Sequence, residues 1–173
     1  MAGQVSYVIP ADELEVVDLK GIRAEALELL RDLIKSVGKS PEDYDIRDVL
    51  PKTDLGLASE TWKISYSAAE TWEKKVDLSL PENKFIVFYG YANKSASPKT
   101  VAIKFYSGAV PIRVFQVEKI YVKEQPFGYF KPFGFKEGEK LIIEFYGKEA
   151  GDDEPMLLGF VAELKGTTLG ERK

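Results

Sequence analysis

Acidic side chains are the residues of this sequence with the clearest capacity for chemistry, and three of them are consecutive. Asp152, Asp153 and Glu154 offer carboxylate oxygens, which are the ligands that Ca²⁺ prefers. Adjacent acids in a turn-rich stretch more often mark a turn that water solvates. We therefore favour a solvated turn, keep calcium as the alternative, and assign no metal-binding residue.

Two further acids lie inside strand-like segments. A glycosidase needs two carboxylates that face each other across a cleft, and Glu144 and Glu163 are the candidates. The alternation of apolar and polar residues in both segments places each acid on the solvated side of a strand. We therefore expect a structural role for both.

Residue types that the sequence lacks exclude most other catalytic sites. The 173 residues include no His and no Cys, which removes the usual proton shuttle, the serine triads, thiolate nucleophiles and the commonest zinc ligands. Neither G-x-x-x-x-G-K-[ST] nor G-x-G-x-x-G occurs, so phosphate-binding loops have no support. We expect a protein that is not an enzyme and has no catalytic, cofactor-binding or metal-binding residues.

The most unusual segment is 126–135, where five aromatic residues, two prolines and two glycines occur together. Aromatic rings bury a large area for little side-chain entropy, so they favour protein interfaces. An edge strand folded over the core and a stacking platform for a sugar ring are the alternatives. The residues assigned to this candidate interface are Phe127, Tyr129, Phe130, Phe133 and Phe135.

The segment 85–92 is apolar on both faces of a predicted strand. Alternation places Phe85, Val87, Tyr89 and Tyr91 on one side, and Ile86, Phe88 and Ala92 on the other. A sandwich strand needs only one buried face, so a predicted helix, a loop or another chain must cover the second. We assign Phe85, Phe88, Tyr89 and Tyr91 to the candidate interface.

The N-terminal third predicts one strand and one helix. Residues 3–9 alternate like a short strand, and apolar residues at three- and four-residue steps predict a helix over 19–37. Asp18 can cap the start of this helix, and Gly38 can end it in a left-handed turn. The polar segment 39–56 contains two prolines and is expected to be a connector.

From Trp62 onward the period of the pattern changes to two, and turn residues separate the apolar runs. This spacing predicts a mainly β fold, a single jelly-roll sandwich or barrel of about eight strands. We expect an N-terminal arm over 1–56, a jelly-roll domain over 57–173, and a bend in the run 111–122 near Phe115. The expected strands are 62–66, 72–80, 85–92, 100–106, 111–122, 129–135, 140–146 and 157–164.

Composition and charge exclude several partners. The formal net charge is -4 and Lys and Arg form no block, which argues against direct nucleic-acid binding and against docking on an anionic membrane. No apolar run approaches the roughly 20 residues that span a bilayer, and residues 1–10 lack the layout of a signal peptide. We expect folding in a cytoplasm. Two Met and no Cys are typical of heat-adapted proteins.

The strands from Trp62 to Leu164, preceded by the strand and helix over 5–37, resemble a known family in length, order and composition. The chain is similar to the smaller of the two single-β-barrel major capsid proteins of tailless, icosahedral Thermus bacteriophages with an internal membrane. The resemblance implies a place in the virion capsid, a second, larger capsid protein as partner, and proximity to the viral membrane around a double-stranded DNA genome. It also implies pairing of subunits into homodimers or larger assemblies, with strand exchange as one route.

Two functions from different classes remain open. The first is a viral structural protein that self-associates through apolar strand faces and the N-terminal arm. The alternative is a β-sandwich carbohydrate-binding module, with Trp62, Trp72 or Tyr129 as the stacking surface.

Overall fold

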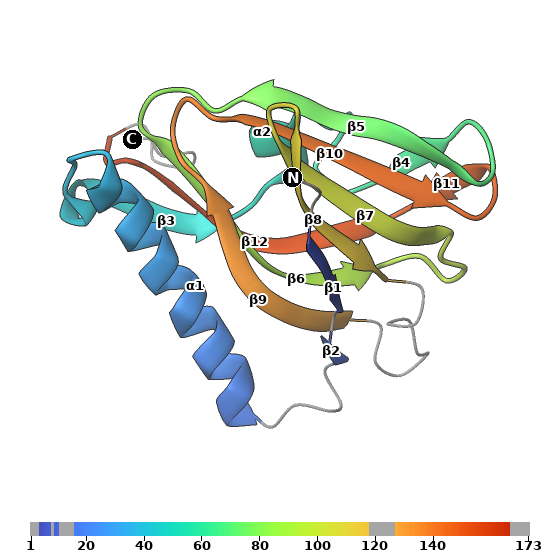
Figure 1. Ribbon diagram of the computed structural model, residues 1–173, viewed down its shortest axis with the longest axis horizontal. Coiled ribbons are helices and arrows are strands. Elements are labelled where there is room, and N and C mark those ends of the chain that lie inside the picture. The colour runs from blue at the N-terminus through green and yellow to red at the C-terminus, as the bar shows by residue number, and fades with distance from the viewer. Residues whose placement is uncertain (1–3, 8, 11–15, 118–126, 167–173) are drawn as a thin grey trace.

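The computed structural model of the protein describes residues 4–7, 9–10, 16–117 and 127–166 (Figure 1). Its elements are β1 (Gln4–Tyr7), β2 (Ile9–Pro10), α1 (Val16–Ser36), a 3-10 turn (Pro41–Asp43), β3 (Tyr44–Asp48), α2 (Pro51–Leu55), β4 (Ile64–Tyr66), β5 (Thr71–Ser79), β6 (Lys84–Asn93), β7 (Thr100–Ser107), β8 (Val110–Gln116), β9 (Phe127–Phe135), β10 (Lys140–Gly147), β11 (Gly151–Asp153) and β12 (Pro155–Leu164). Sheet A has the strand order β1-β8-β7-β10-β5, and sheet B has the order β2-β9-β6-β12-β3. A short antiparallel ladder joins β4 and β11.

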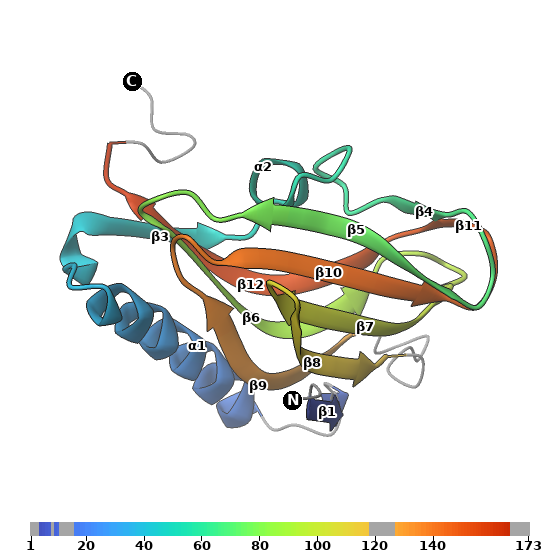
Figure 2. The ribbon, with the colours of Figure 1, turned by 45° about the horizontal axis from the view of Figure 1, so that its top comes forward.

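The two sheets face each other in a β-sandwich, and the chain crosses repeatedly from one sheet to the other (Figure 2). It passes from β5 in sheet A to β6 in sheet B, back to β7, and later through β9, β10 and β12 in the same alternating way. Residues from alternate strand positions fill the space between the sheets, because successive side chains of a strand point to opposite faces. This core includes Val76, Phe88, Phe105, Phe115 and Leu141. The mainly β sandwich of jelly-roll type that the sequence predicts is confirmed.

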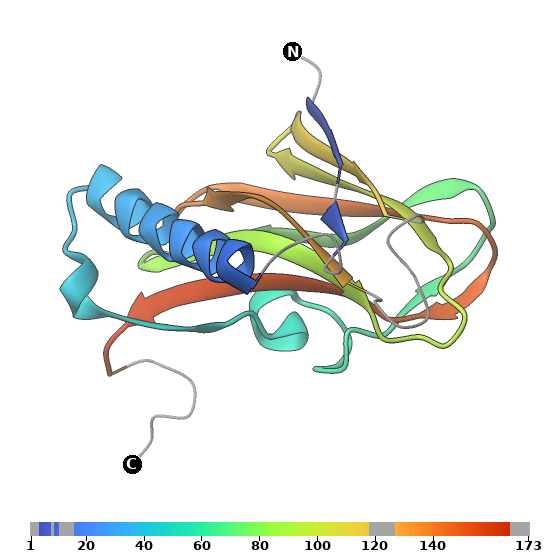
Figure 3. The same ribbon diagram turned by 90° about the horizontal axis from the view of Figure 1, so that it is seen from below.

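Helix α1 covers the outer face of sheet B, on the side of the sandwich away from β5 (Figures 2 and 3). Its apolar stripe of Ala26, Leu30 and Ile34 is fully buried against β6, β9 and β12. A close approach at Gly134 of β9 allows this packing. A Cβ atom at Gly134 would lie 2.8 Å from the carbonyl oxygen of Ile86, 2.7 Å from Val87 Cγ2 and 2.8 Å from Leu33 Cδ1 of the helix, so a larger residue there would force its neighbours to shift.

The bounds of α1 agree with the predicted helix, with one difference at its start. Gly38 has φ 82°, and its N–H donates to the carbonyl of Lys35, so it ends the helix as expected. The helix begins at Val16, which places Asp18 inside its first turn, and the prediction that Asp18 is the N-cap is wrong. Within the described part of the chain, no helix is long and apolar enough to cross a membrane.

The segment 39–56 is not a simple connector, and that prediction is wrong. It contains the 3-10 turn, the edge strand β3, which pairs with β12, and the short helix α2. Tyr44, Val49 and Leu55 are buried and fix this segment to the sandwich. Elements before and after residue 56 share sheet B and its cores, and the expected domain division at this residue stays a prediction.

The N-terminal strands lie at the same edge of the sandwich. β1 pairs in parallel with β8 of sheet A, and β2 pairs with β9 of sheet B. These two ladders account for the predicted strand over 3–9, except at the positions that are not described. The expected run 111–122 ends as β8 at Gln116, one residue after the predicted bend, and residues 118–126 lie outside the described part.

Candidate functional site

The aromatic residues assigned to an interface lie in the core of the single chain. The eight whose side chains are described are at most 7% exposed: Phe85, Phe88, Tyr89, Tyr91, Tyr129, Phe130, Phe133 and Phe135. The side chain of Phe127 lies outside the described residues. α1 covers one face of β6 and sheet A covers the other, so the covering helix, one of the alternatives that the sequence left open, accounts for this burial within the single chain.

Strand β9 (Phe127–Phe135) is a core strand, and its rings Phe130, Phe133 and Phe135 pack toward sheet A, whereas Tyr129 packs in the cluster under α1. Phe130 stacks on Phe115 with ring centroids 4.2 Å apart, and Phe133 meets Phe105 edge-on at 4.8 Å. The ladder of β6 and β9 shifts register between Phe88 and Gly90. This bulge moves Tyr91 into the core between the sheets, although strict alternation would place it under α1.

Of the three aromatic residues considered for sugar stacking, only Trp72 remains accessible. Trp62 is 6% exposed and Tyr129 is 7% exposed, whereas Trp72 is partly exposed on β5. Trp72 pairs across the ladder with Tyr146, whose ring lies edge-on at 5.3 Å. Lys104 of β7 places its ammonium 4.2 Å from the centroid of the Trp72 ring.

Trp72 belongs to a row of partly exposed side chains on the outer face of sheet A, which we call the outer strip. Tyr106 lies in the same row and donates a hydrogen bond of 2.8 Å to Glu144. Burial and this contact with a carboxylate raise the pKa of Tyr106 to about 12. The outer strip consists of Trp72, Lys104, Tyr106, Glu144 and Tyr146. α1 packs on sheet B, so the outer strip has no equivalent cover among the described elements.

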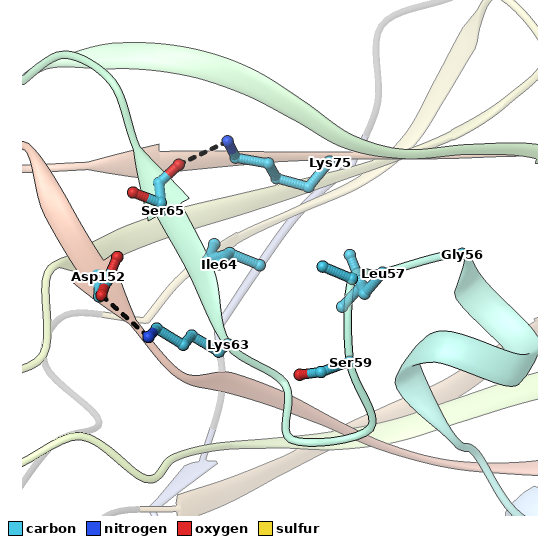
Figure 4. Close-up of a pocket in the computed structure, with 9 residues that line it drawn as sticks. Gly56, Leu57, Ser59, Lys63, Ile64, Ser65, Lys75 and Asp152 are labelled. Carbon is cyan, nitrogen blue, oxygen red and sulfur yellow. Dashed lines mark hydrogen bonds and ion pairs between the residues drawn. The ribbon is translucent and has the colours of Figure 1, made fainter.

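A pocket of about 500 Å³ lies between the loop after α2 and strand β4 (Figure 4). Leu57 and Ile64 give it apolar walls, and its charged groups are already paired. The ammonium of Lys63 lies 3.2 Å from Asp152, and Lys75 donates to the carbonyl of Ser65 at 2.7 Å. Lys63 holds the pKa of Asp152 below its ordinary value. The arrangement offers shape and polar contacts to a small molecule, and it does not pair a nucleophile with a base.

The two candidate glycosidase carboxylates are far apart in the topology and have different partners. Glu144 lies in the outer strip of sheet A, and Glu163 lies in β12 of sheet B, where Arg47 binds it at 3.1 Å. The pair of facing carboxylates that glycoside hydrolysis requires is therefore not formed by these residues.

A buried ion-pair network at α2 was not predicted from the sequence. The carboxylate of Asp54 is 2% exposed and receives both terminal nitrogens of Arg47, at 2.7 and 2.8 Å, and the ammonium of Lys84 at 2.7 Å. The N–H of Leu50 also donates to it. Burial alone raises the pKa of Asp54, but these contacts outweigh it and hold the pKa below its ordinary value. In the sequence, the only sign of this network is that the charged residue Asp54 directly precedes the apolar residue Leu55.

The acidic run 152–154 is not wholly a solvated turn. Asp152 is exposed and pairs with Lys63, but Asp153 ends β11 and is 1% exposed. One oxygen of Asp153 accepts hydrogen bonds from the side chains of Asn93 and Thr100 and from two backbone N–H groups. The expectation of a solvated turn is wrong for Asp153, because a polar cluster inside the end of the sandwich holds this carboxylate.

No family model and no curated protein matches the chain. Among solved structures, it is similar to infectious bursal disease virus, Gx strain, with 8% identity and a TM-score of 0.39 over 76% of this chain and 36% of that one. It thus spans about a third of that chain. It is also similar to the C-terminal CBM6 of LamC, a laminarinase from Zobellia galactanivorans (9% identity, TM-score 0.34, 69% and 99% covered), and to a family 35 carbohydrate binding module from Clostridium thermocellum (10% identity, TM-score 0.27, 70% and 92% covered). Similarity at this level does not extend to function.

Proposed function

We propose that the chain is a viral structural protein without enzymatic activity, the smaller major capsid subunit of an icosahedral shell that surrounds an internal membrane. In this proposal it pairs with a second copy of itself and assembles with a larger capsid protein. The resemblance in length, element order and composition suggests the family. The observation that carries the proposal is the uncovered outer strip of sheet A.

The outer strip has the chemistry of a contact between proteins. Trp72, Tyr106 and Tyr146 are large rings on adjacent strands, and tyrosine and tryptophan are enriched where protein surfaces meet. The strip lies on strands, so its side chains are held in place before binding. Lys104 and Glu144 add one charge of each sign, which can set the register of a symmetric pair.

Sedimentation velocity of the purified chain over a range of concentrations tests the pairing. We expect a dimer or larger assembly in the unmodified protein. Trp72→Ser should weaken its association at least tenfold, because it removes the largest ring of the strip. Lys20→Ala, an exposed change at the start of α1, is the matched control and should leave association unchanged.

Two results would count against the proposal. One is a chain that sediments as a monomer at its highest soluble concentration, and the other is association that Trp72→Ser leaves intact. A mass-spectrometric search for the chain in purified virions tests the shell itself, and its consistent absence there would contradict the capsid assignment.

A carbohydrate-binding module is the second candidate, and the accessibility of Trp72 favours it. A sugar ring can stack on an indole, while Lys104, Tyr106 and Glu144 supply hydrogen-bonding groups for hydroxyls. Calorimetric titration with a panel of glycans separates the two functions. Binding that Trp72→Ser abolishes, in a chain that does not assemble, would support the module and exclude the capsid subunit.

A further inference from the structure

A second pocket, of about 240 Å³, lies between helix α1 and the first half of β12. Arg23 of α1, Tyr89 of β6 and Asp48 at the end of β3 supply its polar side chains. Among the described residues, it shares none with the outer strip of sheet A. Its apolar walls are formed by Val49, Trp62, Met156, Leu157 and Leu158.

The guanidinium of Arg23 is held in place without a carboxylate partner. Its Nη1 donates a hydrogen bond of 2.6 Å to the hydroxyl of Tyr89, and its Cζ lies 4.9 Å from the centroid of the Phe160 ring. Asp48 lines the same pocket, but within the described ranges no acid forms an ion pair with Arg23. A guanidinium has five N–H donors in a planar fork that matches the two oxygens of a carboxylate. Most of these donors therefore remain for a ligand.

The hydroxyl of Tyr89 supplies a further donor. Its oxygen accepts from Arg23, and a guanidinium cannot accept in return, so the phenol proton needs another acceptor. The described part of the chain places no such acceptor within hydrogen-bond distance. Tyr89 is 4% exposed, and burial raises its pKa, so the proton stays on the oxygen at neutral pH. An unmade hydrogen bond in a buried place is costly, and a ligand in the pocket can complete it.

Trp62 forms an apolar wall of the pocket in a conformation that tryptophan rarely adopts. Its φ is 64°, in the left-handed region, and its side chain is 6% exposed. Residues kept in such a conformation cluster at ligand sites, because the surrounding structure must hold them there. The pocket thus combines donors from Arg23 and Tyr89 with a fixed aromatic surface.

We propose that this pocket binds a small organic acid that has one carboxylate and an apolar body of about the size of benzoate. The carboxylate would accept hydrogen bonds from Arg23 and Tyr89, and the apolar body would pack against Trp62. A cavity of about 150 Å³ can admit benzene, so a pocket of about 240 Å³ has room for such a molecule. Asp48 opposes a second negative charge on the ligand, which favours a monocarboxylate.

Calorimetric titration of the full chain with sodium benzoate tests the proposal. We expect benzoate to bind, and benzamide to bind about tenfold more weakly or less, because a neutral amide forms no ion pair with Arg23. Equal affinities for the two compounds would overturn the site. No heat of binding at about 10 mM benzoate would overturn it too.

Substitution of the two donors tests their roles. Arg23→Gln and Tyr89→Phe should each weaken benzoate binding by about tenfold or more, because each removes a donor to a charged oxygen. Arg31→Gln is the matched control, since Arg31 is also exposed on α1 but does not line this pocket. Arg23 is exposed, so Arg23→Gln should still fold, and unchanged benzoate affinity in this variant would refute the proposal.

Tryptophan fluorescence tests the location of the bound acid. The sequence contains two tryptophans, Trp62 and Trp72, so Trp72→Phe leaves Trp62 as the single indole. We expect benzoate to change the emission of Trp62 with the same midpoint that calorimetry gives for this variant. Constant emission during a titration that releases heat would place the acid elsewhere and overturn the assignment. Because the pocket shares no described residue with the outer strip, these outcomes do not depend on subunit assembly.

Discussion

At the scale of single residues, the ion-pair network of Asp54 is the contact most sensitive to substitution. Asp54→Asn keeps the shape of the side chain but removes the buried carboxylate that pairs with Arg47 and Lys84, which then share Glu163 alone within this network. Loss of one member of a buried pair costs about 3 kcal/mol or more. We expect the free energy of unfolding in urea at pH 7 to fall by about 3 kcal/mol.

The same network gives stability a defined pH dependence. The pKa of Asp54 is lower in the folded protein than in the unfolded chain, where a carboxyl has a pKa of about 4. Its contribution is therefore complete above that value and is lost as the pH falls through the lower, folded pKa. The difference between the unmodified protein and Asp54→Asn should shrink in acid. A difference that persists at pH 2 would contradict this assignment.

Single residues also show where sequence patterns reach their limit. Alternation located both faces of 85–92, but it placed Tyr91 on the wrong face, because the bulge between Phe88 and Gly90 interrupts the period of two. Asp153 was taken as part of a solvated turn because its donors, Asn93 and Thr100, are more than 50 residues away in the chain. Contacts at such separation leave no local pattern.

At the scale of elements, the packing of α1 decides how sheet B is covered. Gly134→Ala would place a Cβ within 2.8 Å of Leu33 Cδ1 and of the carbonyl of Ile86, and 2.7 Å from Val87 Cγ2. Overpacking of this kind costs about 1 to 3 kcal/mol. We expect Gly134→Ala to lower stability and to expose the apolar surface beneath α1, which fluorescence of a hydrophobic dye reports.

A second glycine supplies the matched control for this prediction. Gly21 lies in α1, and a Cβ there meets no atom within 4 Å. Gly21→Ala should therefore raise stability by up to about 1 kcal/mol, since alanine has the higher helix propensity. Equal effects of the two substitutions would show that helix propensity, and not the approach of Leu33 to Gly134, governs this part of the fold.

Elements with long, regular patterns were predictable, and short or charged ones were not. The eight expected strands each correspond to a strand of the structure, and the apolar stripe located α1. The sequence did not predict β3, because Asp45, Arg47 and Asp48 make its pattern polar. Only Tyr44 of this strand is buried. β11 has three residues and pairs with an equally short strand, so neither propensity nor periodicity could identify it.

At the scale of the whole molecule, the two faces of the sandwich differ in their cover. α1 closes the outer face of sheet B, while the outer strip leaves aromatic residues partly exposed on sheet A. The chain therefore hides its most apolar strand surface by itself, and the partly exposed aromatic side chains of the outer strip lie on the other sheet. In the proposed capsid, this asymmetry would give one defined face through which subunits could meet.

Strands β1 and β2 close the sandwich at one edge, and the removal of these two strands gives the last prediction. β1 and β2 pair with β8 and β9, so deletion of residues 1–10 leaves unpaired backbone groups on both sheets at once. Open strand edges invite pairing with another chain. We expect the truncated chain to form higher assemblies and to aggregate more readily, as measured by light scattering. Adding Val114→Lys to the truncation places a charge on the exposed edge strand β8 and should restore solubility. A truncated chain that sediments like the full one would show that these two ladders do not protect the edge.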